Sequence, residues 1–420
     1  MKFIYIVALG SGLALTQLHA QSQSIPLSYQ EYLRKVSTHN LGYASEKLNV
    51  SAAQADLVAS RVFNDPELSM GYFNNQNKSL KMGEGYSIGV SQTLTLGKRG
   101  AAIGLARSQS ELAQIQLADF FRNLQADATI SYLEAVKQQS LYGVKLNAYK
   151  NLQQLASSDS IRYRLGKIME VDATQSKLES GILYNELLQA GTELKSAYSS
   201  LAVMMGTFSA DTLYQPDTDF KIGNREFILA DLMDRAVTTR ADLIAALKNT
   251  AVAHQTVRVA KRENIPDIGL SLEVGRNARV RNEEAPAPPF TGITAGVTIP
   301  LKFSALNRGA VNAAKLREQQ ASLQYDQMRL QVQTEVLKAY HQYQSLSGQV
   351  RHYENGMLQQ AKQVLNGKIY SYNRGEVSLL EVLNAQRTFD EVQTQYIETV
   401  FNCHVSLVEL ERSAGIWDLR

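Results

Sequence analysis

The pattern of hydrophobic and polar positions changes period in a fixed order, and that order occurs twice along the chain. Residues 28–63 and 226–263 are rich in helix-forming side chains and contain no proline, which predicts helices. Each stretch precedes two segments in which apolar side chains alternate with small or polar ones, the pattern of strands. Each half therefore predicts one β-hairpin, with polar loops at 75–85 and 277–289. The alternating apolar residues are Leu68, Met70 and Tyr72; Tyr86, Ile88 and Val90; Ile268, Leu270, Leu272 and Val274; and Ile293, Ala295, Val297, Ile299 and Leu301.

A long segment without proline follows each hairpin, from Arg99 to about Ser157 and from Arg308 to about Asn366. Each is close to sixty residues, or roughly 90 Å as a continuous helix. The segments after them place residues at steps of three and four with a period of seven, which predicts helices packed side by side as in a coiled coil. The stripe comprises Tyr184, Leu187, Gly191, Leu194, Tyr198, Leu201 and Met205 in the first half, and Leu379, Val382, Gln386, Phe389, Gln393, Tyr396, Val400, Cys403, Leu407 and Leu410 in the second.

The two halves are also similar in sequence, in the same order, with an offset that drifts from 200 to 209 residues. This similarity predicts an internal duplication. The expected organisation is a signal peptide at 1–20, a first repeat at 21–206, a connector at 207–225, a second repeat at 226–413 and a tail at 414–420. The matching segments are Asn64-Asp65-Pro66-Glu67 with Asn264-Ile265-Pro266-Asp267, Ile88-Gly89-Val90 with Ala295-Gly296-Val297, Arg99-Gly100-Ala101 with Arg308-Gly309-Ala310, and Tyr163-Arg164-Leu165-Gly166 with Tyr372-Asn373-Arg374-Gly375.

The N-terminus has the pattern of a secretory signal. Lys2 precedes an apolar run from Phe3 to Leu15, and a polar stretch begins after Ala20. A transmembrane anchor is the alternative, but the run is shorter than the ~20 residues of a spanning helix and ends in small residues. No other segment reaches about 18 consecutive apolar residues, so the mature chain is either exported and soluble or enters a membrane as β-structure.

The length of the strands favours the membrane. About ten residues suffice for a tilted strand to cross the hydrocarbon core. A strand of a soluble sandwich is the alternative, but the second face carries Gly, Ser and Thr with few charges, and four strands flanked by helices offer no second sheet. Four strands cannot close a barrel, and open edges are costly in lipid. We expect an α+β membrane protein whose barrel is shared between chains. Three chains with four strands each would give twelve strands, which is within the known range for such barrels.

Composition and charge narrow the function further. A chain with 44% hydrophobic residues folds, and a net charge of +3 gives no support to a nucleic-acid partner. The single cysteine, Cys403, excludes an internal disulfide and a cysteine-based zinc site, and its place on the helical stripe indicates a small buried side chain.

No pattern of catalytic or cofactor-binding residues is present, so we expect no enzyme and no cofactor. Gly97-Lys98 is followed by Arg99, and Gln92 occupies the place of the first glycine of a phosphate-binding loop. Metal binding is conceivable only through rings shared between subunits. The mature histidines are scattered at His39, His254, His341, His352 and His404.

The duplicated helix, hairpin and long helix with Tyr-x-x-Gly turns resembles the TolC family of outer-membrane efflux proteins. The similarity extends from about residue 28 to 413, and the stretch from Tyr372 to Gln386 is its most specific part. The resemblance implies a homotrimer in the outer membrane whose long helices form a tunnel through the periplasm. It further implies an exit duct that receives substrates from an inner-membrane pump through a periplasmic adaptor protein.

The two helical turns are the first candidate site. Gly166 and Gly375 permit the positive φ of a tight connection between helices. By resemblance, these turns form the periplasmic tip, which contacts the adaptor and constricts the pore. Tyr163 and Tyr372, with Arg164 and Arg374 beside them, then become candidates for the bonds that keep the tip shut.

The second candidate site is acidic. Glu381 and Asn384 fall where the family places lumen-facing acidic residues, and three copies of Glu381 would make a negative ring. Asn384 departs from the family pattern and halves that charge. In the first turn Glu170 is the counterpart, after a connection that is two residues shorter. A solvated surface charge is the alternative role for either glutamate.

A non-conducting periplasmic adaptor or scaffold that binds through its coiled coils is the alternative function. It would need soluble β-domains rather than lipid-facing hairpins. The sequence does not identify the exported substrate.

Overall fold

The computed structural model describes residues 23–75, 81, 83–208, 212–217, 225–301 and 306–418. The expected signal peptide at 1–20 lies outside these residues, as do parts of the loop at 75–85, the connector and the tail. Within the described ranges, none of the helices combines the length and the apolar character that a membrane span requires.

The chain divides into two compact units, and each takes residues from both sequence repeats. The units are therefore not the repeats, and the long helix α3 (Lys98–Arg164) has residues in both. Unit 1 comprises Met1–His39, Ser131–Lys221 and Gly356–Glu398, and unit 2 comprises Asn40–Ile130, Ile222–Asn355 and Thr399–Arg420.

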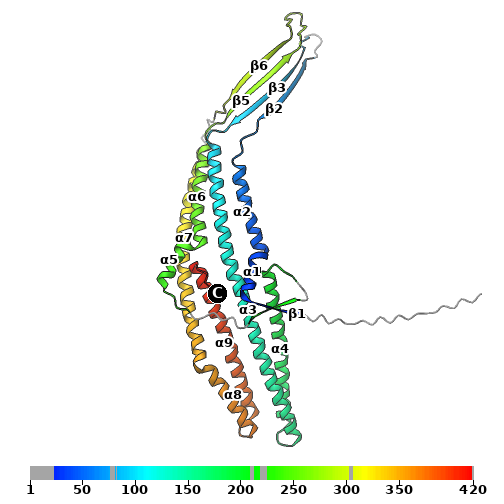
Figure 1. Ribbon diagram of the computed structural model, residues 1–420, viewed down its shortest axis with the longest axis vertical. Coiled ribbons are helices and arrows are strands. Elements are labelled where there is room, and N and C mark those ends of the chain that lie inside the picture. Colours follow the sequence, from blue (N-terminus) through cyan, green and yellow to red (C-terminus); the bar gives the residue numbers. More distant parts are fainter. Residues whose placement is uncertain are drawn as a thin grey trace, which may run out of the picture. The chain divides into compact units, whose positions relative to one another are not determined.

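Unit 2 contains a four-stranded antiparallel sheet in the order β2-β3-β5-β6 (Figure 1). Its strands are β2 (Glu67–Asn75), β3 (Gly83–Leu94), β5 (Ile268–Asn277) and β6 (Phe290–Thr298). The two predicted hairpins are thus confirmed, and β3 joins them through β5. Strands β2 and β6 are the outer edges of this sheet.

The strand register places the alternating apolar residues predicted from the sequence on one face of the sheet. Met70 pairs with Ile88, Ile88 with Val274 and Val274 with Ile293, so these four side chains form one row across the sheet. They are exposed, and Met70 retains 74% of its accessible surface. The neighbouring row, on the opposite face, is Ser69, Gly89, Glu273 and Thr294. The sheet therefore has one apolar face and one face of mostly small residues, which also carries Phe73 and Phe290 near one end.

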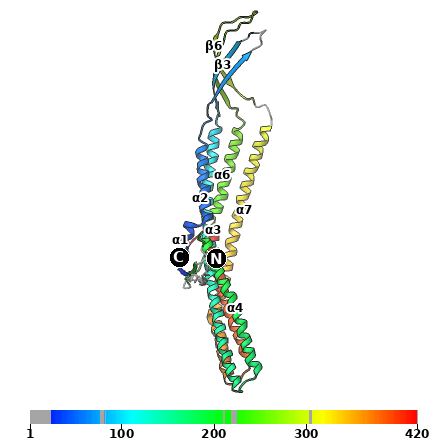
Figure 2. The ribbon, with the colours of Figure 1, turned by 90° about the vertical axis from the view of Figure 1, so that its right-hand side faces the viewer.

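Unit 2 also contains helices. They are α2 (Leu41–Ala59), the first part of α3, α5 (Leu229–Thr239), α6 (Ala241–Arg262) and α7 (Leu306–His352). Helices α6 and α7 pack along each other, as both ribbon views show (Figures 1 and 2).

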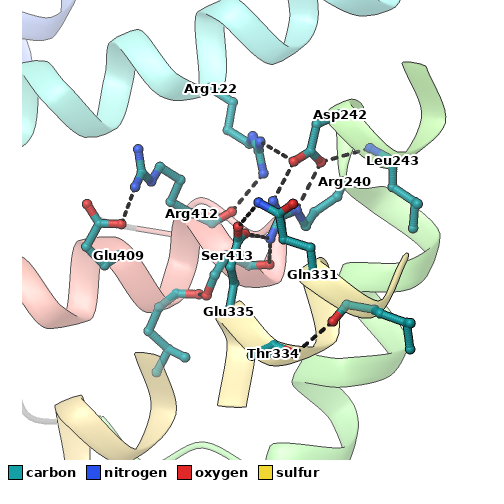
Figure 3. A network of polar contacts seen from close by, with 12 residues as sticks. Arg122, Arg240, Asp242, Leu243, Gln331, Thr334, Glu335, Glu409, Arg412 and Ser413 are labelled. Carbon is teal, nitrogen blue, oxygen red and sulfur yellow. Dashed lines mark hydrogen bonds and ion pairs between the residues drawn. The ribbon is translucent and has the colours of Figure 1, made fainter. Parts of the chain in front are cut away.

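A buried arginine joins these helices away from the sheet (Figure 3). Arg240 binds Asp242 and Glu335 and donates to the backbone oxygen of Ser413, while Arg122 lies 3.4 Å from Asp242 and donates to the oxygen of Arg412. Burial alone would raise the pKa of Asp242, but the hydrogen bond and charge of Arg240 outweigh it and lower that pKa. The network connects α3, α6, α7 and the end of α9 (Leu379–Ala414).

Unit 1 contains two helical hairpins and a small parallel sheet. The last part of α3 precedes α4 (Glu170–Met204), and α8 (Leu358–Asn373) precedes α9. Strand β1 (Gln23–Leu27) pairs with β4 (Thr212–Pro216) next to helix α1 (Tyr29–His39). The sequence pattern did not predict this sheet, because β4 lies in the expected connector. Buried Tyr132 holds it, since its hydroxyl donates to the oxygen of Leu27 and accepts from the amide of Asp217, both at 3.0 Å.

The two long helices differ. Helix α3 runs for 67 residues without a break, longer than predicted. The prediction of an equally continuous second helix is wrong, because a π-helical turn, η1 (Tyr353–Met357), separates α7 from α8. Gly356 adopts φ +128° there, a conformation that favours glycine, and Asn147 takes the corresponding place in α3.

Candidate functional site

The two turns between helices lie at the same end of unit 1 and have the same backbone geometry (Figures 1 and 2). Gly166 has φ +66° and Gly375 has φ +78°. The amide after each glycine donates to an oxygen five residues earlier, Lys167 to Arg162 at 2.9 Å and Glu376 to Ser371 at 3.0 Å. Both turns are therefore Schellman motifs, in which a residue in the left-handed region satisfies the last carbonyls of a helix.

Tyr372 is buried, and its hydroxyl connects the two hairpins of unit 1. It donates to the carboxylate of Asp159 on α3 at 2.9 Å, and this aspartate is fully buried. Burial raises the pKa of Asp159 above its ordinary value, against the opposing effects of the hydrogen bond from Tyr372 and the charge of Arg162. Burial also raises the pKa of Tyr372, and Asp159 adds to that increase.

Arg162 completes this contact. Its guanidinium lies 3.7 Å from the Asp159 carboxylate and 4.8 Å from the centre of the Tyr372 ring, and it donates to the Tyr372 backbone oxygen at 3.4 Å. The ring and the carboxylate thus share one cation. We call Asp159, Arg162 and Tyr372 the inter-hairpin cluster.

An apolar core surrounds the inter-hairpin cluster in unit 1. Leu152 from α3 packs with residues from the start of α9, and the buried members of this core are Leu152, Tyr372, Leu379, Val382 and Leu383. The low polarity explains why Asp159 requires both the hydroxyl and the guanidinium.

The other tyrosine and the two predicted arginines have different surroundings. Tyr163 is 42% exposed, and the charge of Glu170 beside it, with a hydrogen bond to the same residue, raises the pKa of Tyr163. Arg164 is exposed. Arg374 binds Glu376 at 2.7 Å and the hydroxyl of Tyr370 at 3.0 Å on the surface. Of the six residues proposed for the tip, only Tyr372 takes part in the inter-hairpin cluster.

Sequence reasoning missed Asp159 and Arg162, although a signal was present. Leu152, Ala156 and Asp159 are buried at steps of four and three along α3. An aspartate within such a stripe is unusual, because a buried carboxylate requires partners. Arg162, one turn further along the same face, could have been chosen as one of them.

Glu381 and Asn384 lie three residues apart and are both exposed on the first turns of α9. Glu381 binds Lys368 of α8 at 2.6 Å, and the amide of Ser378 donates to its carboxylate at 3.5 Å. These two hydrogen bonds lower the pKa of Glu381. Ser378-Leu379-Leu380-Glu381 has the sequence of a capping box, and Glu381 makes the carboxylate half of it, a local role that was not considered for Glu381 from the sequence.

The expected shortening of the first turn is not present. Helices α4 and α9 both begin four residues after their glycine, at Glu170 and Leu379. Glu170 therefore corresponds in position to Leu379. The residue that corresponds to Glu381 is Asp172.

A polar groove of about 600 Å³ lies between α3, α4 and α9 in unit 1. Asp390 is at its wall, where burial raises the pKa of this carboxyl to about 6 against the effects of Gln386, which donates to it at 2.8 Å, and of Lys145. Lys145 is already bound to Glu186 at 2.7 Å. Asp390 is therefore a partly buried acid for which no ion pair is found among the interactions described.

The described residues contain no group of three or more His, Cys, Asp and Glu side chains that could hold a metal ion. Cys403 is partly buried in unit 2, and burial raises the pKa of its thiol.

A family model described as "Outer membrane efflux protein" matches residues 232–416. The cobalt-zinc-cadmium resistance protein CzcC of Cupriavidus metallidurans is 22% identical over 410 residues, which cover 96% of this chain and 94% of CzcC. The pyoverdine export outer membrane protein OpmQ of Pseudomonas putida is 22% identical over 291 residues, which cover 68% of this chain and 59% of OpmQ.

Solved structures share the fold over almost the whole chain. CusC matches with a TM-score of 0.77 at 18% identity, covering 92% of each chain. The CmeC outer membrane channel of Campylobacter jejuni matches with a TM-score of 0.77 at 15% identity, covering 92% of this chain and 85% of CmeC.

Proposed function

We propose that this chain, whose residues 232–416 match the model of the outer membrane efflux proteins, is an outer-membrane export channel. It is a passive duct that receives substrates from an inner-membrane pump through a periplasmic adaptor. The sheet lies in the outer membrane and the helices extend into the periplasm.

The two-faced sheet is the observation that carries this proposal. One face exposes Met70, Ile88, Val274 and Ile293, and the other carries small residues. Exposed apolar strands are costly in water and favourable in lipid. Lipid offers no hydrogen bonds to the unpaired N–H and C=O groups of edge strands, so β2 and β6 must pair with strands of other copies. Three copies supply twelve strands and complete a closed barrel around the pore, which makes the protein a homotrimer.

The same sheet argues against a soluble adaptor. An adaptor in the periplasm would expose the apolar row to water, and contiguous apolar patches of this kind are rare on soluble proteins. The channel function accounts for both faces, because lipid covers one and the pore lies against the other.

The inter-hairpin cluster is proposed to restrain the tip in its closed arrangement. It connects α3 with α8 close to the two glycine turns, so its loss frees one hairpin from the other. The turn residues Tyr163, Arg164, Gly166, Arg374 and Gly375 are proposed as the contact surface for the adaptor. Glu381, with Asn384 beside it and Asp172 in place of Glu170 in the first hairpin, is proposed to face the lumen.

The first substrates to test are divalent metal ions. CzcC is named for cobalt, zinc and cadmium resistance and covers nearly the whole chain. A deletion strain is expected to become sensitive to one or more of these metals and to recover when the gene is returned. Unchanged sensitivity to metals, with new sensitivity to organic toxins, would show that the exported substrates are organic molecules and would leave the channel proposal intact.

Conductance in planar bilayers tests the channel itself. Purified full-length protein is expected to insert and give discrete current steps, which grow in the Arg162→Ala variant because the tip loosens. Absence of steps for both proteins, under conditions in which a control porin conducts, would contradict the proposal.

A further inference from the structure

The small-residue face of the sheet carries negative charge and no positive charge. In the register, Glu273 of β5 lies between Gly89 of β3 and Thr294 of β6. Glu67, at the start of β2, lies on the same face in the next row, opposite Ser91. The positions of this face in the four described strands contain no lysine or arginine.

The other charged residues of the strands belong to the opposite face. Glu84 and Arg276 alternate with the small residues and lie with the apolar row, because Tyr86 pairs with Arg276 and Asn74 with Glu84. The charges are therefore separated by face: both glutamates of the small-residue face lack a partner of opposite sign among its strand positions.

The neighbours of Glu273 are too small to cover it. A Cβ at Gly89 would lie 2.7 Å from the hydroxyl of Ser69, and a Cβ at Gly296 would lie 2.6 Å from that of Ser271. The serine side chains thus lie over the glycines of the neighbouring strands, so this part of the face is flat. Glu273 is exposed, and a hollow of about 340 Å³ adjoins it, which Phe73 and Phe290 also line.

We propose that Glu67 and Glu273 form an acidic belt on the inner wall of the β-part of the pore and make the channel selective for cations. This inference rests on the proposed channel, in which the small-residue face lines the pore. The substrate class that it assigns is positively charged: hydrated metal cations or organic cations.

The geometry gives the belt its effect. The two carboxylates of one chain lie two strands and one inward row apart, or roughly 12 Å, from strand spacing and rise. Each chain contributes two charges, so three copies contribute six around one axis. This separation is close to the Debye length of about 10 Å at 0.1 M salt, so the charges act together at low salt and separately at high salt. Low-dielectric walls strengthen the potential inside such a passage.

The reversal potential across a bilayer with a potassium chloride gradient tests the belt. The wild type is expected to prefer potassium, and more strongly as salt is lowered. The Glu67→Gln, Glu273→Gln double variant is expected to lose most of this preference, with a severalfold lower potassium-to-chloride permeability ratio. Glu84→Gln is the matched control, because it removes the same charge from the other face, and it is expected to behave as the wild type.

A rescue variant separates charge from folding. Thr294 pairs directly with Glu273 on the same face, so Glu273→Gln with Thr294→Glu returns a carboxylate to the same row. It is expected to restore the selectivity lost in Glu273→Gln. If the wild type conducts and the double variant keeps the same reversal potential, the acidic-belt proposal is wrong, whereas the channel proposal is unaffected. If the wild type gives no current where a control porin does, the channel proposal itself fails.

Discussion

The two helical hairpins of unit 1 have the same backbone and different side-chain contacts. Both turns are Schellman motifs, and both return helices begin four residues after the glycine. Yet Tyr372 is buried against Asp159, whereas Tyr163 is exposed beside Glu170. Gly181 in α4 takes the place of Asp390 in α9. Duplication has preserved the turn, while the two tyrosines at corresponding positions have acquired different partners.

The largest effect is expected from the two arginines at the end of α3, of which only Arg162 belongs to the inter-hairpin cluster. Arg162→Ala leaves Asp159 buried without its cation, so local stability around the cluster should fall by about 3 kcal/mol. Arg164→Ala removes an exposed arginine two residues further on and should change it by less than about 0.5 kcal/mol. Native-state hydrogen exchange of the last turns of α3 and α8 measures both. Equal protection in the two variants would show that the cluster does not hold the hairpins together.

The tyrosines should differ in the same sense by a smaller amount. Tyr372→Phe removes the donor to a buried carboxylate, which costs about 1–3 kcal/mol. Tyr163→Phe, the matched change in the first hairpin, should be nearly neutral because its hydroxyl is exposed. The same exchange experiment, with conductance as a second readout, compares them. A larger effect at Tyr163 would reverse the comparison.

Asp390 predicts a pH dependence at α9 that has no counterpart at Gly181 of α4. Its pKa in the fold is about 6, above the ordinary value near 3.9. The fold therefore favours the protonated carboxyl, and this contribution is complete below about pH 4 and lost as the pH rises through 6. Because the groove leaves the group partly solvated, we expect an effect on the order of 1 kcal/mol. Asp390→Asn should remove the dependence of α9 protection on pH between 4 and 7. An unchanged profile would assign it to another group.

The smallest difference concerns the acids of the first helical turns. Glu381→Gln weakens the bond to Lys368 and the bond to the Ser378 amide, which should lower stability only slightly because exposed ion pairs contribute little. If Glu381 also faces the lumen, the cation preference in planar bilayers should fall, while Asp172→Asn gives a comparison in the first hairpin. A stability loss without any change in ion selectivity would leave Glu381 only its capping role.

Much of the fold could be predicted from the sequence because its period changes sharply. Alternating residues such as Met70 and Ile88 fixed the faces of the strands, and the absence of proline indicated the long helices. The break at Gly356 was missed because one glycine in a helical pattern is ambiguous. The β1–β4 sheet was missed because its partners lie far apart in the sequence and depend on Tyr132, a tertiary contact.

The candidate site was less predictable for a physical reason. A turn motif is local, so Gly166 and Gly375 could be identified from sequence. The partner of Tyr372 is set by packing between hairpins, and Asp159 lies 213 residues from it. In the sequence, only the position of Asp159 within an apolar stripe of α3 indicated that it needs a buried partner.

Cross-linking between the edge strands tests the central claim most directly. Ser69→Cys in β2 and Thr294→Cys in β6, in a Cys403→Ser background, place thiols on the outer strands, roughly 14 Å apart within one chain because two strands lie between them. A bismaleimide of about 8 Å, shorter than that separation, then joins different copies only. In outer membranes, the expected product is a ladder of two and three chains that ends at three. A chain that stays monomeric, or a ladder that continues beyond three, would contradict a closed pore built from three copies.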